Sequence, residues 1–393
     1  MNSPTESSDN SFKEFLDSEK SGGIILLGCV VIALIMANSP LQDLYFGVLK
    51  HRMGIVFDDF VLKKSIEHWI NDGLMTVFFF LVGLEIKREV IKGELSSFQK
   101  SSLPISAALG GMAIPATIFY LLNDGEETAR GWAIPMATDI AFALGILSLL
   151  GNRVPNSLRV FLAALAIADD LGAIIVIAIF YTSQVLWTNV FLSGIVFLVL
   201  LVLNRAGVRN QWAYLVAGAF LWYFVYKSGV HATVSGVLAA FAIPATGNTG
   251  ESLLEELEHL LHKPVNYFIM PIFALANTGV ILESHSMDGL GSPLSMGILF
   301  GLAIGKPVGV LIFSWILVLT RISILPENAN WRHIVGAGLL SGIGFTMSIF
   351  IALLSFRQPE YQTIAKISIL IASVASGLAG FVILRRTKSM EPN

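Results

Sequence analysis

The sequence is poor in charged residues and contains a single cysteine. Only 13% of its 393 residues are charged and 54% are hydrophobic, whereas soluble domains carry about 25% charged residues. So little charge cannot cover the surface of a soluble globule of this length. The lone Cys29 excludes a disulfide framework and a cysteine-based zinc site, and the net charge of −3 argues against a nucleic-acid partner.

The hydrophobic residues are gathered in long runs, and a helix needs about 20 such residues to cross a lipid bilayer. We therefore expect one polytopic, all-α membrane domain over residues 1–393 with about twelve spans. The polar and mostly acidic residues 1–20 lack the basic start of a signal peptide, so the first span is expected to be retained. The expected spans are 20–38, 66–86, 102–122, 131–150, 157–181, 188–204, 211–226, 229–244, 264–282, 294–319, 333–355 and 364–385.

Twelve spans put both chain ends on the same side of the membrane. Of the 25 Lys and Arg residues, 16 fall on the side of the ends, eight on the other side, and Lys306 within a span. Because Lys and Arg concentrate in cytoplasmic loops, both termini are predicted to be cytoplasmic. The short spans 211–226 and 229–244 are the weakest assignment, and an odd total would move the C-terminus to the other side.

The longest loop on the outer side, residues 39–65, contains two short strand-like runs. They cover 45–48 and 55–61, with Met53-Gly54 between them. This pattern predicts a small periplasmic β-hairpin, although an irregular loop fits it equally well. The exposed edge of such a hairpin could pair with a second copy of the chain.

Four ionisable residues fall at mid-span depth, namely Asp139, Asp169, Asp170 and Lys306. A charge at the centre of the bilayer costs about 2.5–3.5 kcal/mol, so such residues are rare without a partner or a role. They are therefore the main candidates for function.

Asp169 and Asp170 are adjacent, so on a helix their side chains point about 100° apart and cannot both face lipid. Buried neighbouring carboxylates hold a proton more readily than an exposed one, and when deprotonated they offer hard oxygen ligands for an alkali or alkaline-earth cation. The alternative is a pair of aspartates satisfied structurally by neighbouring helices.

The segment from Pro135 to Asp139 predicts an interrupted helix. Proline removes a backbone hydrogen bond, and Thr138 and Asp139 follow directly. A broken helix frees backbone dipoles inside the membrane, and a charged side chain can compensate them. A simple proline kink beside a polar patch is the alternative.

Lys306 belongs to a span in which Gly297, Gly301, Gly305 and Gly309 recur every four residues. Such a ridge lets a neighbouring backbone approach closely. Lys306 is the cation available to offset the three buried acids. A lysine that reaches an interface is the alternative, but Lys306 lies deep in its span.

Two glycines in mid-span, Gly342 and Gly344, predict that the eleventh span is unwound near Thr346, although a close helix contact would also use small residues. The fourth and eleventh spans are each the centre of a three-span group, 102–181 and 294–385. Interrupted helices at corresponding positions indicate inverted repeats with a binding site between them.

The ninth span is preceded by an acidic, histidine-containing segment. His259 and His262 are three residues apart and so share a helix face. Histidine titrates near neutral pH, so a pH-responsive entrance is one interpretation. An ordinary solvated helix start is the alternative, and a zinc site is a weaker one. His231 is expected to be a structural hydrogen-bonding residue at the end of a span.

These residues lie in a series of motifs that resembles the NhaA family of sodium/proton antiporters over nearly the whole chain. Seven motifs occur in the family's order, which makes chance agreement negligible. They are Trp69-Ile70-Asn71-Asp72-Gly73, Val82-Gly83-Leu84-Glu85-Ile86-Lys87-Arg88-Glu89, Ala137-Thr138-Asp139-Ile140-Ala141-Phe142-Ala143, Asp169-Asp170-Leu171-Gly172, Gly229-Val230-His231-Ala232-Thr233, Gly305-Lys306-Pro307 and Gly342-Ile343-Gly344-Phe345-Thr346-Met347-Ser348.

The resemblance implies twelve helices with crossed, discontinuous helices IV and XI, and a homodimer stabilised through the hairpin of the first loop. It implies that Asp169 and Asp170 bind Na⁺ and carry protons. It further implies that Thr138, Asp139 and Lys306 balance charge where the broken helices cross.

The resemblance also implies pH control near Glu258, His259 and His262, with Glu85 at the entrance. Asp72, Gly344 and Thr346 are expected to support the site. One departure concerns the residues before that entrance: the family pattern has basic residues where this chain has Glu255 and Glu256, so its pH activation is expected to differ in detail.

The resulting hypothesis is a secondary active antiporter of the bacterial inner membrane that exports Na⁺ or Li⁺ in exchange for external protons. The exchange is expected to be electrogenic and activated by pH, with no cofactor and no enzymatic activity. A carrier of organic anions would need more deep cations than Lys306. An intramembrane aspartyl protease would need a Gly-x-Gly-Asp motif, which the sequence lacks. A passive channel would conduct without regard to a proton gradient.

Overall fold

The structure is a computed structural model, and it describes residues 19–57, 60–182, 184–245, 252–282 and 289–387. Helices dominate the described part, and they occupy each of the twelve predicted spans. Five of them are long and apolar enough to cross a membrane unaided, and three further pairs of helices meet that test across a bend. The all-α membrane fold is therefore confirmed. The acidic N-terminal segment 1–18 lies outside the described residues.

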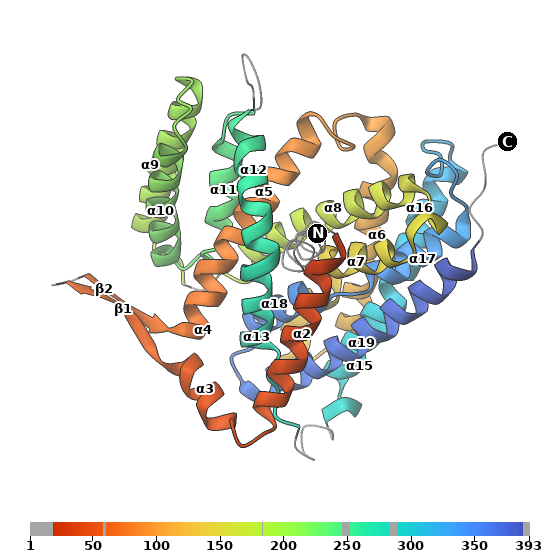
Figure 1. The fold of residues 1–393 in the computed structure, drawn as a ribbon, viewed down its shortest axis with the longest axis horizontal. Helices are drawn as coiled ribbons and strands as arrows, with labels where there is room; N and C mark the ends of the chain where they lie inside the picture. The colour runs from red at the N-terminus through yellow and green to blue at the C-terminus, as the bar shows by residue number, and fades with distance from the viewer. Residues whose placement is uncertain (1–18, 58–59, 183, 246–251, 283–288, 388–393) are drawn as a thin grey trace, which may run out of the picture.

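The first loop forms the predicted hairpin, but not from the predicted strands. Helix α2 (Glu19–Ala37) turns by 111° into α3 (Gln42–Lys50), and the antiparallel strands β1 (Arg52–Phe57) and β2 (Phe60–Ser65) follow. The predicted strand 45–48 is wrong because Tyr45 and Leu49, four residues apart, share a buried helix face. Met53-Gly54 lies within β1 and is not the turn. The hairpin projects beyond the helices (Figure 1).

The second span is one long helical unit built from three consecutive segments. It comprises α4 (Ile66–His68), the π-helical η1 (Trp69–Leu74) and α5 (Met75–Ile91). Glu85 and Arg88 lie near its C-terminal end. Asp72 lies in the π-helical segment, one and a half turns into the span.

The first three-span group contains the predicted interruption. Its outer helices are α6 (Phe98–Leu122) and α8 (Asn156–Phe180). The central span consists of the 3₁₀ turns η2 (Glu127–Gly131) and η3 (Ile134–Met136), an extended stretch, and α7 (Ile140–Leu149), with η4 (Gly151–Arg153) after it. Its two halves are bent by 41°.

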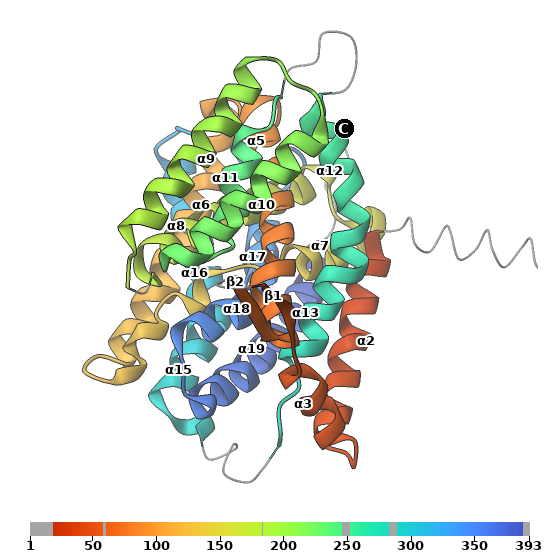
Figure 2. The same ribbon diagram turned by 90° about the vertical axis from the view of Figure 1, so that its left-hand side faces the viewer.

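Spans six to nine lie beside this group, with α9 and α10 in front in the view of Figure 2. The seventh and eighth spans are separate helices, because α10 ends at Gly229 in the left-handed conformation (φ +88°), which favours glycine. The elements are α9 (Trp187–Arg205), α10 (Gln211–Ser228), α11 (Val234–Ala242), α12 (Leu253–Pro264), the π-helical η5 (Val265–Ile269) and α13 (Met270–Asn277).

The second three-span group repeats the interruption in its central span. Helices α17 (Trp331–Ser341) and α18 (Phe345–Ser355) are bent by 44° around Gly342-Ile343. They are preceded by η6 (Gly289–Gly291), α15 (Pro293–Phe300), the π-helical η7 (Gly301–Gly305) and α16 (Lys306–Leu319), and followed by α19 (Pro359–Arg386).

The glycine ridge of this group packs against α6, as the spacing predicts. A Cβ on Gly297 would meet Phe119, and a Cβ on Gly309 would meet the backbone of Gly110. The residue numbers rise along one helix as they fall along the other, so α15–α16 runs antiparallel to α6. The two groups therefore begin in opposite directions, as inverted repeats do. Helix α8 packs against α5, α6, α7 and α17, which places its middle at the centre of the molecule.

Candidate ion site at the crossing of two broken helices

Helix α8 brings Asp169 and Asp170 into the interior. Both side chains are buried, with 0% and 2% of their surfaces exposed. The close packing of α8 depends on Gly172, where a Cβ would collide with Met112. The acid pair is thus carried by a continuous helix that neighbouring helices fix in place.

Asp139 connects the two broken helices. Its side chain accepts a hydrogen bond from the backbone N–H of Phe142 (3.1 Å) and so caps α7. Its other oxygen accepts from the backbone N–H of Thr346 (3.1 Å) and from the Thr346 hydroxyl. A single carboxylate therefore lies at the N-terminal ends of α7 and α18, where helix dipoles favour negative charge.

The backbones of the two breaks also touch. The N–H of Asp139 donates to the carbonyl of Ile343 (2.7 Å). The Ser348 hydroxyl donates to the carbonyl of Ile134 (2.7 Å). Gly344 begins α18, and a Cβ there would crowd Leu302 and Ser348. Two backbone carbonyls at the breaks are thus satisfied by groups of the opposite broken helix.

Lys306 provides the positive charge at the crossing. Its side chain is fully buried, and Nζ lies 2.7 Å from Asp169 Oδ2. Nζ also donates to the carbonyl of Met136, at the C-terminal end of η3. The Thr138 hydroxyl lies 2.6 Å from the same Asp169 oxygen and 2.9 Å from the carbonyl of Ser341. Lys306 therefore neutralises Asp169 and a helix C-terminus together.

One oxygen of each carboxylate in the acid pair is left over. Among the described residues, Asp169 Oδ1 and Asp170 Oδ1 are buried and have no hydrogen-bond partner. A buried oxygen without a partner is costly unless a proton or a cation satisfies it. The acid pair can thus accept either.

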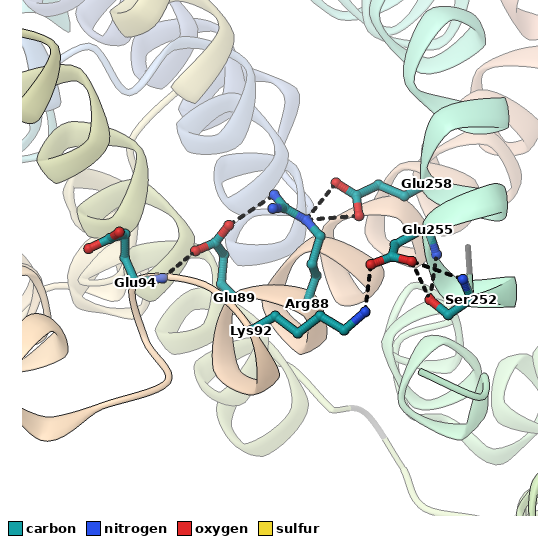
Figure 3. Close-up of polar contacts among 7 residues, drawn as sticks. All are labelled: Arg88, Glu89, Lys92, Glu94, Ser252, Glu255 and Glu258. Carbon is teal, nitrogen blue, oxygen red and sulfur yellow. Dashed lines mark hydrogen bonds and ion pairs between the residues drawn. The ribbon is translucent and has the colours of Figure 1, made fainter. Parts of the chain in front are cut away.

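The C-terminal end of α5 and the N-terminal part of α12 form a second, wetter cluster, shown in Figure 3. The guanidinium of Arg88 reaches Glu258 (3.0 Å) on α12 and Glu89 (2.9 Å) on its own helix. The backbone N–H of Glu94 donates to Glu89 (2.9 Å). Arg88 is 38% exposed, so this cluster is in contact with solvent.

A second ion pair spans the same two helices. Lys92 Nζ lies 2.7 Å from a carboxylate oxygen of Glu255, whose other oxygen accepts from Ser252 in the capping box of α12 (Figure 3). The hydrogen bond from Lys92 and those from Ser252 lower the pKa of Glu255 to about 2. Glu255 therefore stays ionised around neutral pH. Glu255 is thus matched by Lys92, the residue that follows α5.

The remaining residues predicted for the entrance are only partly brought together. Glu85 lies one turn before Arg88 on α5 and is partly buried. His259 is exposed on α12, and the ring of His262 contacts the Asn266 amide. Neither histidine joins the ion pairs of Figure 3. Within the described chain, no group of three His, Cys, Asp or Glu side chains is arranged to hold a metal ion.

Asp72 lies apart from the acid pair. It pairs with His68 (3.0 Å), and His231 Nε2 lies 3.7 Å from its other oxygen. His231 also contacts the Thr233 hydroxyl (2.8 Å), consistent with the structural role expected for it. Asp72 thus belongs to a histidine cluster in the half of the span opposite to Arg88.

Sequence reasoning missed Arg88, Glu89 and Lys92 as parts of the entrance. Their signal was local: Arg88 follows Glu85 at the i,i+3 spacing that places two side chains on one helix face. The sequence also did not reveal that the backbone carbonyls of Met136 and Ser341 take part, because the role of a backbone group cannot be recognised from the type of residue.

Comparison with known proteins shows which family the chain resembles in sequence. The family model described as "Na+/H+ antiporter 1" matches residues 13–384. The chain is 53% identical to the Na(+)/H(+) antiporter NhaA 2 of Flavobacterium johnsoniae, over 95% of this chain and 92% of that one. It is 49% identical to the Na(+)/H(+) antiporter NhaA 1 of Clostridium beijerinckii, over 96% of both chains.

A solved structure has the same fold at low sequence identity. It is that of the sodium proton antiporter MjNhaP1 from Methanocaldococcus jannaschii at pH 8, with a TM-score of 0.51 and 12% identity, and it covers 93% of this chain and 90% of that one. With two broken helices crossing beside a buried acid pair, and with a family model and half-identical relatives that extend over almost its whole length, this chain belongs to the Na+/H+ antiporter 1 family.

Proposed function

We propose that this chain exchanges Na⁺, or Li⁺, for protons across the bacterial inner membrane and exports sodium from the cytoplasm. The observation that carries the proposal is the pair of unpartnered, buried oxygens on Asp169 and Asp170 beside Lys306. Its relatives' names support the choice of ions. The chain is proposed to act as a transporter without enzymatic activity or a cofactor.

The first step of the proposed cycle is competition at the acid pair. When both carboxylates are deprotonated, a Na⁺ ion exchanges its hydration water for their oxygens, which are hard ligands suited to an alkali cation. Lys306 Nζ lies 2.7 Å from Oδ2 of Asp169 and so competes with Na⁺ for the charge of this carboxylate. Protonation of the acid pair, or its neutralisation by Lys306, then displaces Na⁺.

The second step is reorientation of the loaded site. An empty, doubly anionic site is costly in a dry interior, so the conformation changes only when the site holds protons or the ion. This requirement gives exchange in place of a leak. Inward proton flow then drives Na⁺ out of the cell, with more than one proton per ion, which makes the exchange electrogenic.

Thr138, Asp139 and Lys306 hold the crossing in this proposal, with Gly344 and Thr346 as supporting residues. Each balances backbone charge at a helix end, as the contacts of Asp139 and Lys306 indicate. Asp72 is proposed to act at a distance, because its partners are His68 and His231.

The entrance at the ends of α5 and α12 is proposed to control activity by pH. Glu85 and Glu258 lie within electrostatic range of each other, and His259 and His262 follow on α12. Glu85 is proposed as the link to the site, since it lies one turn further into the span than Arg88. Alkalinisation that removes protons from this cluster would open the path to the acid pair.

The assembly proposed is a homodimer in which the β1–β2 hairpins of two copies pair edge to edge. The projecting position of the hairpin supports it (Figure 1). Both termini are proposed to lie in the cytoplasm, on the strength of the Lys and Arg distribution.

The test uses everted membrane vesicles from a host that lacks its own antiporters. A respiratory pH gradient is established, NaCl is added, and a pH-sensitive dye is followed at mildly acidic and at alkaline pH. On addition of NaCl, the quenched fluorescence of the dye should recover in vesicles with the wild-type chain and should not recover with Asp170→Asn. Asp43→Asn, the same change at an exposed residue of α3, is the matched control and should behave as wild type. A well-expressed wild type that gives no response at either pH overturns the proposal.

A further inference from the structure

A lipid-sized groove lies between the ends of α16, α17 and α19. Its volume is about 720 Å³, and it is separate from the acid pair. Helix α16 ends at Leu319, α17 begins at Trp331 and α19 ends at Arg386, so the groove is located where three span ends meet. The Lys and Arg distribution assigns these ends to the cytoplasmic side.

The walls of the groove are apolar along the spans. They are formed by Leu311, Ile312, Val335 and Ile383, with Trp315 and Trp331 at the level of the helix ends. Trp315 is 52% exposed, although it is the largest apolar residue of α16. Tryptophan in this position is typical of the boundary between lipid tails and head groups.

Two arginines line the same groove at the end where α17 begins and α19 ends. Arg332 and Arg386 are exposed, and within the described chain neither guanidinium forms an ion pair. Arg88, by contrast, is held between two carboxylates. A basic pocket between helices on the cytoplasmic side, continuous with an apolar channel, matches an anionic head group joined to an acyl chain.

We propose that this groove binds a phospholipid with an anionic head group from the cytoplasmic leaflet. The guanidiniums of Arg332 and Arg386 hold the phosphate, the two tryptophans flank the glycerol region, and an acyl chain lies along Leu311, Val335 and Ile383. The bound lipid connects α16, which begins with Lys306, to α17, which ends at Ser341 beside Thr138. It thereby holds together two of the elements that form the crossing.

The experiment uses the full-length purified chain, stripped of lipid in detergent. Native mass spectrometry then measures retention of added phosphatidylglycerol and of phosphatidylcholine. Wild type should retain phosphatidylglycerol preferentially. The double variant Arg332→Gln/Arg386→Gln should bind it about 30-fold more weakly, because each basic side chain near an anionic lipid surface contributes roughly fivefold. Arg332→Lys/Arg386→Lys should keep most of the binding.

The matched control is Arg130→Gln/Arg357→Gln, which removes two exposed arginines from the opposite membrane face and should leave binding unchanged. Glycerol 3-phosphate should compete only weakly, since it lacks the acyl chain. Equal competition by glycerol phosphate, equal binding of the two phospholipids, or an undiminished double variant overturns the proposal.

The wild-type chain gives an independent result that does not depend on how the variants fold. A phosphatidylglycerol with a photoreactive acyl chain should label peptides of α16, α17 and α19. Labelling confined to other helices overturns the assignment. Neither measurement depends on transport activity.

Discussion

The crossing and the proposed entrance, at the ends of α5 and α12, both contain acids paired with bases, but they lie in opposite environments. At the crossing, Asp139, Asp169 and Lys306 are buried: Lys306 pairs with Asp169, and Asp139 and Lys306 also bind backbone groups. At the entrance, Arg88 and Lys92 remain 38% and 53% exposed, and they bind carboxylates only.

The difference lies in what each charge compensates. A charge at the crossing offsets helix ends that water cannot reach, so its removal leaves a buried group without a partner. A charge at the entrance stays exposed to water, and its ion pair only replaces contacts that it would otherwise make with water. Its contribution to the free energy of unfolding is therefore small. The entrance can therefore tolerate sequence change, such as Glu255 opposite Lys92, whereas the crossing cannot.

The largest expected effect is at Lys306. Lys306→Gln leaves Asp169 buried without its cation and should lower the free energy of unfolding by about 3–5 kcal/mol. Thermal unfolding in detergent measures the loss. Lys50→Gln, at the exposed end of α3, removes a lysine without this cost and serves as control. An unfolding temperature equal to that of the control would contradict the account of the crossing.

The next effect is at Asp139. Asp139→Ala removes a cap from α7 and leaves the N–H and hydroxyl of Thr346 unsatisfied, at a cost of about 2–4 kcal/mol. Asp139→Asn keeps an acceptor for both helix ends and should cost less. The same unfolding measurement ranks the two variants. If alanine and asparagine prove equally harmful, charge outweighs hydrogen bonding at this residue.

A smaller effect is expected where α6 and α16 touch. Gly309→Ala places a Cβ against the backbone of Gly110 and should destabilise by about 1–3 kcal/mol, because backbone cannot yield as a side chain can. Gly194→Ala on α9 meets no atom within 4 Å and should be harmless or slightly stabilising. Equal unfolding temperatures for the two variants would show that the glycine ridge is not tightly packed.

At the entrance, charge reversal should move the pH profile more than the stability. Glu255→Lys adds positive charge near the entrance, lowers the proton affinity of neighbouring groups and shifts activation to lower pH. Lys92→Glu should shift it to higher pH. Each shift should be at most about 0.7 pH unit, since an exposed pair contributes about 1 kcal/mol or less. The double reversal restores the pair and should return the midpoint of vesicle activity to that of wild type; a persistent shift would contradict the pairing.

The smallest effect concerns the titration of Glu255 itself. Its pKa falls from 4.5 to about 2 on folding, so the pair with Lys92 contributes fully above pH 4.5 and is lost as pH falls toward 2. The difference in stability between wild type and Glu255→Gln should thus be constant around neutral pH and narrow only in acid. A difference that changes near pH 7 would assign the pH response to this pair.

Much of the fold could be predicted because the membrane imposes strong rules. Apolar runs gave the twelve spans, and Pro135 and Gly342 marked the two interruptions, which the bends of 41° and 44° confirm. The spacing of Gly297 to Gly309 predicted close packing, and the contacts with α6 confirm it. The strand expected at 45–48 was wrong because Tyr45 packs on the main bundle through its hydroxyl, which donates to Leu275. That long-range contact has no local signal.

The residues of the candidate site could be predicted from the sequence, but the contacts that each of them forms could not. The cost of burying Asp139, Asp169, Asp170 and Lys306 singled them out. That Lys306 pairs with Asp169, and that Asp139 serves both breaks, depends on backbone positions that distant segments bring together. Asp72 and the exposed His259 show the converse, since residues grouped by motif can lie in separate places.

The shared cap at Asp139 has a mechanical consequence. A hydrogen bond tolerates displacements of only a few tenths of an ångström, and this carboxylate holds α7 and α18 at once. If either half-helix slides along its axis, its hydrogen bond to Asp139 breaks. The two half-helices are therefore expected to move together. In the proposed cycle, we therefore expect access to the acid pair to alternate by movement of α7 and α18 together against the helices around them, and not by either half-helix shifting alone.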